Sequence, residues 1–134
     1  MNEQLFKDRT KRLGLRFIEL VEELPKTRTA DVLGRQLIRS GTSIGANYRS
    51  ACRGRSAADV IAKFRIVEEE ADESIYWLEL LVESNLVPST RVEKLLRETD
   101  EIIAMTVASI KTLQKRIALP PTNRKSKIEN RKSL

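Results

Sequence analysis

Apolar residues recur at intervals of three and four along four long stretches of the chain, and a turn signal closes each stretch. The first stretch ends at Pro25, because the residue before a proline is pushed out of the helical region. Helices are therefore expected over about residues 2–24, 30–53, 56–84 and 89–118. Long helices with short connections predict an all-α fold, an up-down-up-down antiparallel four-helix bundle that forms one domain over residues 1–118.

The expected second helix contains Gly34, Gly41 and Gly45. Each glycine costs about 1 kcal/mol relative to alanine in a helix interior, so three of them need a reason. Either a neighbouring helix approaches closely, or the helix breaks near residues 40–43; we favour a continuous helix. The capping residues expected for the second, third and fourth helices are Thr29 or Asp31, Ser56 with Asp59, and Ser89 or Thr90 with Glu93.

Charge is segregated along the chain. Residues 1–65 carry a net charge of +7, residues 66–110 of −8, and residues 111–134 of +7. Pro120 and Pro121 end the fourth helix, and the basic segment that follows has few apolar residues, so residues 119–134 are expected to form a disordered tail. The basic parts suit nucleic acid or an acidic partner, while the acidic middle suits an internal counter-charge.

The composition excludes most enzymes. The chain has no histidine and a single cysteine, Cys52, which removes the usual general base, the common nucleophile pairs and an internal disulfide. We therefore expect no enzymatic activity, no metal and no cofactor. The first twenty residues are charged and contain no long apolar run, so neither a signal peptide nor a membrane span is expected, and a reducing cytoplasm is the simplest location.

Two motifs could be interpreted as ligand-binding sites, one for a metal and one for a phosphate. Residues 68–73 contain five carboxylates, but di-iron bundles need Glu-x-x-His, so a solvated face or ion pairs to Arg65 and the basic second helix are favoured. Residues 41–45 are rich in glycine, yet they lack the lysine of a phosphate-binding loop and follow no strand. Within the carboxylate run, Glu70, Glu73 and the adjacent Trp77 are expected to pack against a neighbouring helix, with Asn47, Arg49 or Arg53 as the partner of a buried carboxylate.

The candidate nucleic-acid contacts are basic residues of the first two helices and of the turn that follows them. Phosphate contacts need only positive charge, whereas base stacking needs aromatic rings, which are few in this chain. The predicted contacts are Lys7, Lys11, Arg12, Arg16, Arg35, Arg39, Arg49, Arg53 and Arg55.

A resemblance adds to these patterns. The segment 36–86 contains SGTSIGANYR, then AADVIAKF, then EADE followed by YWL. In these motifs it resembles the four-helix-bundle proteins known as 23S rRNA intervening-sequence proteins, and the flanking helices extend the likeness to about residues 5–118. The segment CRGR at residues 52–55 departs from the family pattern by adding basic residues at the turn between the second and third helices.

The resemblance implies a homopentamer with a central channel, in a family without an established enzymatic reaction. The chain is also similar to the accessory variability protein of diversity-generating retroelements, a basic pentameric bundle that binds nucleic acid and a reverse transcriptase. Two functions follow as expectations. One is a non-catalytic oligomer that binds RNA or DNA, and the other is a structural or adaptor oligomer that docks an acidic protein.

Overall fold

The computed structural model describes residues 2–118, which fold into four α-helices and contain no strand. The helices are α1 (Glu3–Glu22), α2 (Arg28–Cys52), α3 (Ala57–Glu83) and α4 (Ser89–Ala118). The predicted all-α fold with four helices is confirmed. The predicted tail, residues 119–134, lies outside the described residues.

The helix ends agree with the prediction at α3 and differ at α2. The hydroxyl of Ser56 accepts the amide of Asp59 at 3.1 Å, so Ser56 caps α3 as predicted. The Asp59 carboxylate reaches back to the amide of Arg55 at 3.1 Å, one residue before the position that a strict capping box uses. The cap of α2 is Thr27, which accepts the amide of Ala30, so the prediction of Thr29 or Asp31 was wrong. At α4 the helix already includes Ser89, so neither Ser89 nor Thr90 precedes it as a cap.

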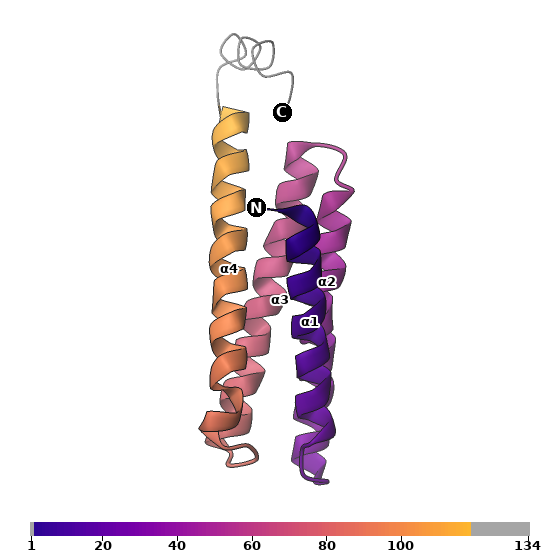
Figure 1. Ribbon diagram of the computed structural model, residues 1–134, viewed down its shortest axis with the longest axis vertical. Coiled ribbons are helices and arrows are strands. Elements are labelled where there is room, and N and C mark those ends of the chain that lie inside the picture. The colour runs from indigo at the N-terminus through magenta and orange to yellow at the C-terminus, as the bar shows by residue number, and fades with distance from the viewer. Residues whose placement is uncertain (1, 119–134) are drawn as a thin grey trace.

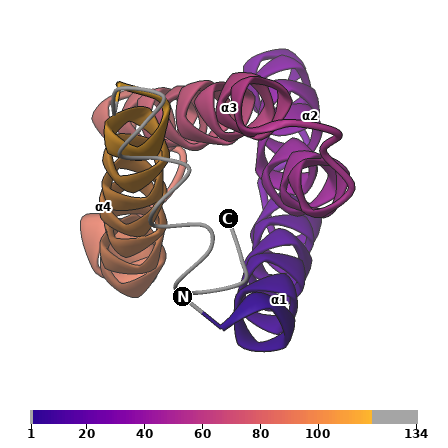
Figure 2. The same ribbon diagram turned by 90° about the horizontal axis from the view of Figure 1, so that it is seen from above.

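Consecutive helices run antiparallel and lie side by side (Figure 1). Seen from above, α1 and α4 stand on either side of the open edge of the bundle (Figure 2), and they contact each other least among the neighbouring helices. Ion pairs join this edge. Arg9 lies 3.5 Å from Glu98 and Arg16 lies 3.4 Å from the same carboxylate. Ion pairs therefore supplement the shared apolar core at the edge where the α1 and α4 backbones approach each other least.

The core is aliphatic, with an aromatic layer near the N-terminal end of α1. Phe6 packs edge-on against Tyr48 with ring centroids 4.4 Å apart, and Phe64 stacks on the other side of Tyr48 at 6.1 Å. These rings come from α1, α2 and α3, so the layer ties three helices together.

Of the 18-residue windows in the described helices, none is apolar enough to cross a membrane.

The glycines of α2 allow α1 to approach closely, and α2 is continuous as predicted. Gly41 lies under the ring of Phe17, where an added Cβ would fall 2.4 Å from Cδ2. Gly45 faces Thr10, and Gly14 on α1 faces Thr42. Close approach, rather than a break in the helix, is therefore the reason for these glycines.

Candidate nucleic-acid interface

The structure divides the nine predicted basic residues into two sets. Four of them pair with carboxylates of the same chain: Lys7 with Glu3 at 3.1 Å, Arg16 with Glu98, Arg35 with Asp31, and Arg39 with Glu70 and Glu73. The other five, namely Lys11, Arg12, Arg49, Arg53 and Arg55, form no ion pair within residues 2–118. The second set keeps its charge available for a partner.

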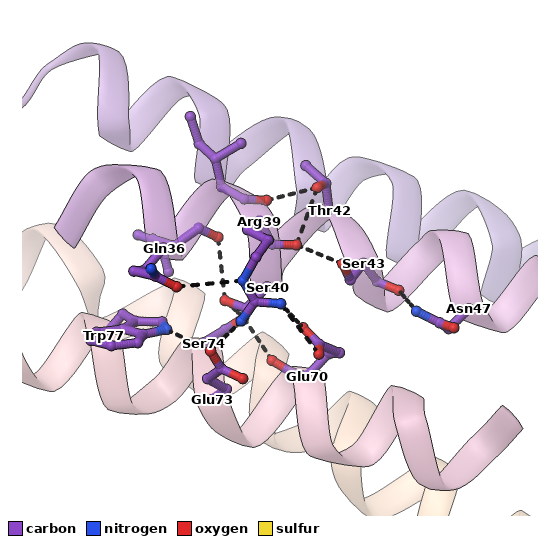
Figure 3. Close-up of polar contacts among 12 residues, drawn as sticks. Gln36, Arg39, Ser40, Thr42, Ser43, Asn47, Glu70, Glu73, Ser74 and Trp77 are labelled. Carbon is purple, nitrogen blue, oxygen red and sulfur yellow. Dashed lines mark hydrogen bonds and ion pairs between the residues drawn. The ribbon is translucent and has the colours of Figure 1, made fainter. Parts of the chain in front are cut away.

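Arg39 is the partner that sequence reasoning missed for the carboxylates of α3 (Figure 3). Its guanidinium lies between Glu70, at 3.2 Å, and Glu73. The hydrogen bond to Glu73 raises the pKa of Arg39, so the guanidinium stays charged. The expectation that Asn47, Arg49 or Arg53 would hold these carboxylates was therefore wrong.

Two further contacts complete this part of the α2–α3 seam. The indole N–H of Trp77 donates to Glu73 at 3.2 Å, a contact within α3 between residues one turn apart. Beneath it, the buried hydroxyl of Ser74 donates to Ser40 at 2.8 Å. Asn47 donates to the carbonyl of Ser43 in its own helix instead of crossing to α3 (Figure 3). The seam thus has a structural role, and it neutralises Arg39.

The turn between α2 and α3 gathers three cations, which we name the turn cluster: Arg53, Arg55 and Lys63. With Ser50, Ser56 and Asp59 they line a depression of about 480 Å³. Asp59 is the one carboxylate among these lining residues, and its Oδ2 accepts the amide of Arg55. The turn cluster therefore keeps a surplus of positive charge at one end of the bundle.

Lys63 is a member of this cluster that the sequence prediction left out. It lies four residues after Asp59 on α3, so one helical turn brings it to the same side. That spacing is the signal in the sequence that could have identified it.

A second basic surface lies between α1 and α2, and we name it the α1–α2 groove. Lys7, Lys11 and Arg49 line it together with the half-exposed aliphatic residues Leu15 and Ile18, around a volume of about 390 Å³. Its floor consists of small residues: Thr10, Gly14, Thr42, Gly45 and Ala46. Arg49 thus belongs to a different surface from Arg53 and Arg55.

Three carboxylates of α3 that do not meet Arg39 form an acidic surface. Glu68, Glu69 and Asp72 line a depression of about 280 Å³ with Arg65 and with Ile103 of α4. Within the described chain these three carboxylates form no ion pair, including none with Arg65. We name Glu68, Glu69 and Asp72 the acidic ridge.

An apolar groove opens beside the N-terminal end of α1, with a volume of about 610 Å³. Tyr48, Cys52, Phe64 and Met105 line it, and Tyr48 is 4% exposed. Burial raises the pKa of the Tyr48 phenol and, less strongly, that of the Cys52 thiol. Both groups are therefore held in their neutral forms.

These pKa shifts predict a loss of stability in alkaline solution. Unfolded tyrosine and cysteine ionise near about pH 10 and 8.5, and both folded pKa values are raised, so their stabilising effect is complete below about pH 8.5 and declines as pH rises. Tyr48→Phe should reduce the fall in unfolding free energy between pH 7 and pH 10.5, measured by urea denaturation. A fall that Tyr48→Phe leaves unchanged would contradict the burial of this phenol as its cause.

The described residues offer charge and no catalytic constellation. Among residues 2–118, no three or more Cys, Asp or Glu side chains come together as a possible metal site. No histidine exists in the chain to activate Cys52, whose pKa burial raises. The arrangement can bind anions through Arg53, Arg55 and Lys63, and this is the chemistry that the geometry supports.

Comparisons with known proteins place this geometry in a family. A crystal structure of a protein of unknown function from the S23 ribosomal protein family, from Bacteroides thetaiotaomicron, superposes with a TM-score of 0.77. It is 35% identical, and the match covers 83% of this chain and 99% of that one. No curated protein matches significantly. The family model of the 23S rRNA-intervening sequence protein matches residues 3–108, and the chain therefore belongs to this family.

Proposed function

We propose that this protein is a non-catalytic, oligomeric bundle of the cytoplasm that binds the phosphate backbone of RNA or DNA. The observation that carries the proposal is the turn cluster, where Arg53, Arg55 and Lys63 surround a depression with a single carboxylate, Asp59. Guanidinium and ammonium groups are the usual ligands of nucleic-acid phosphates. Arg53 and Arg55 lie in the segment that departs from the family pattern, so the activity belongs to this chain more than to the family as a whole.

The binding should be tolerant of sequence. Base-specific contacts need side chains that reach base edges in a groove, or that hold an unstacked base against an aromatic ring and hydrogen-bond its edge. No tryptophan, tyrosine or phenylalanine lines the depression at the turn cluster. Phosphate contacts alone fix position without reading sequence, so structured RNA and DNA duplexes of different sequence should bind with similar affinity.

The expected assembly is a homopentamer, as the family resemblance implies. Exposed Leu5, Leu15 and Tyr76, each more than half exposed, support association because such side chains gain from being covered. A cyclic oligomer repeats the turn cluster on every subunit, and several weak phosphate contacts then add through avidity.

Light scattering is expected to give about five times the subunit mass of 15.3 kDa at micromolar concentrations. A monomer mass across that range would contradict the oligomer.

Fluorescence anisotropy with a labelled, structured RNA tests the function itself. Each phosphate that is neutralised releases counterions, so log K should fall linearly with log salt, with a slope of about −0.9 per contact. Binding that is strong at 50 mM salt and lost near 300 mM is the expected result. No binding at low salt, or binding that salt does not change, would overturn the proposal and favour an adaptor that docks an acidic protein.

A further inference from the structure

We propose that the acidic ridge of one copy of this protein seats in the α1–α2 groove of the next copy. This inference rests on the oligomer in the proposed function and names the two surfaces that hold it together. The groove presents Lys7, Lys11 and Arg49, and the ridge presents three carboxylates on α3. The two surfaces lie on different helices, so one copy offers both halves of the contact.

Two of the three groove cations and all three ridge carboxylates form no ion pair within residues 2–118. Lys11 and Arg49 form no ion pair among residues 2–118, and Lys7 reaches only Glu3, its neighbour one turn earlier on α1. Glu73 and Glu70 on the same helix as the ridge are held by Arg39, so α3 already pairs with α2 wherever its carboxylates can reach. The three ridge carboxylates lie together in one depression and are unpaired, so they are available to another molecule.

The heights of the two surfaces along the bundle agree. Ser40 on α2 and Ser74 on α3 are hydrogen-bonded at 2.8 Å, which fixes these positions at one level. Gly45 lies further along α2 and contacts Thr10 of α1, where an added Cβ would be 3.3 Å from Oγ1. Because α2 and α3 are antiparallel, the level of Gly45 is that of position 69 on α3 (Figure 1). The basic half of the groove is therefore level with Glu69.

The apolar half of the groove lies level with an exposed aromatic residue of α3. Gly14 faces Thr42, whose Cα would lie 3.9 Å from a Cβ added at Gly14. Thr42 is level with Asp72 by the same count from Ser40. One helical turn beyond Gly14, Ile18 is then level with Tyr76 on α3. Ile18 is 36% exposed and Tyr76 is 52% exposed, so each covers apolar surface of the other. Excluding water there strengthens the charge pairs alongside.

A contact between two different surfaces is heterologous, and its geometry decides whether a ring or a filament forms. Here the matched surfaces already share their levels, so a rotation about an axis parallel to the helices joins the copies without a shift along that axis. Such a rotation closes into a ring. In a ring of this kind every turn cluster lies at the same end, where the α2–α3 turn is in each subunit (Figure 1).

Charge reversal on each surface, and on both together, tests the contact. The groove variant is Lys7→Glu/Lys11→Glu/Arg49→Glu, and the ridge variant is Glu68→Lys/Glu69→Lys/Asp72→Lys. Each alone should raise the concentration for half-assembly at least tenfold, measured by analytical ultracentrifugation at 50 mM salt. An equimolar mixture of the two should regain association between unlike copies, because each variant retains one intact surface and the altered surfaces complement each other. Unlike copies must alternate and a five-membered ring cannot alternate, so the mixture should form even-numbered assemblies rather than a closed pentamer.

A control for the groove variant makes the same change in net charge elsewhere. Lys94→Glu/Arg97→Glu/Lys115→Glu alters exposed residues of α4 outside both surfaces and should assemble as the wild type does. Circular dichroism of every variant checks that the helices are retained. The wild type is the reference for both conclusions. A monomeric wild type would overturn the oligomer of the proposed function. An oligomeric wild type whose variants assemble equally well would overturn this contact alone.

A cross-link tests the contact without charge reversal. In a Cys52→Ala background, Ile18→Cys/Tyr76→Cys should form disulfides between copies under mild oxidation, visible as a ladder on non-reducing gels. Val32→Cys/Tyr76→Cys is the control, because Val32 is 51% exposed yet lines neither surface. Equal ladders from the two pairs, or none from Ile18 and Tyr76, would overturn the contact.

Discussion

Replacing Gly41 by alanine is expected to lower the free energy of unfolding by about 1–2 kcal/mol. The added Cβ would lie 2.4 Å from Cδ2 and 2.7 Å from Cγ of Phe17, which is fully buried and cannot turn away. Overpacking of this kind costs about 1–3 kcal/mol, and alanine regains up to about 1 kcal/mol of helix propensity. Thermal unfolding followed by circular dichroism, at one protein concentration, measures the difference.

Gly14→Ala is the matched comparison, since it places the same methyl group on the facing helix. Its nearest atoms would be 3.9 Å away, which is ordinary van der Waals contact. The substitution should therefore stabilise the protein by about 0.5–1 kcal/mol through helix propensity alone. A Gly41→Ala protein as stable as Gly14→Ala would show that α1 and α2 are not packed as closely as described.

The contrast between these glycines shows what periodicity can predict about this fold. Glycines in a helix interior indicate that something compensates their cost, and the sequence left close approach and a broken helix open. Only the partner helix decides between them, because the ring of Phe17 comes from another part of the chain. Helix number and order, by contrast, follow from local spacing and from Pro25, and these were predicted correctly.

The sequence identified the start of a helix correctly only where two residues at a fixed spacing both accept amides at that start. Ser56 and Asp59 each satisfy an amide near the start of α3, and this spacing identifies the start of the helix. At α2 the residues Thr27, Thr29 and Asp31 all carry a capping oxygen, so composition does not choose among them. The choice of Thr27 depends on where the chain leaves the turn after Pro25, which is set by the packing of α1 on α2.

The charged residues show more clearly what the sequence alone cannot predict. A run of carboxylates on α3 predicts pairing with basic α2, but which arginine pairs depends on the register between two helices. The structure sets that register by the Ser40–Ser74 contact, so Arg39 rather than Arg49 faces Glu70 and Glu73. Sequence alone could not separate arginines used inside the fold from those left outside it. Arg53 and Arg55 are recognisable because they lie in a turn, where no helix face covers them.

Reversing the turn cluster should have the largest effect on function. Arg53→Glu/Arg55→Glu/Lys63→Glu changes three cations around one depression, and nucleic-acid affinity at 50 mM salt should fall at least a hundredfold. The slope of log K against log salt should also become shallower, because fewer counterions are released. Fluorescence anisotropy with the labelled RNA measures both quantities. Arg49 is left unchanged, since it lines the α1–α2 groove and its reversal would also disturb assembly.

The control for this experiment has the same change in net charge. Lys94→Glu/Arg97→Glu/Lys115→Glu lies on exposed positions of α4 and should lose affinity only a few-fold, through the weaker overall field. Removing residues 119–134, which carry five basic residues, should weaken binding and leave a salt-sensitive remainder that depends on the turn cluster. Equal losses from the turn cluster and from α4 would mean that total charge, rather than its placement at the α2–α3 turn, governs binding. Each variant must keep its wild-type mass, because avidity multiplies the contribution of every subunit and a change in assembly would imitate a lost phosphate contact.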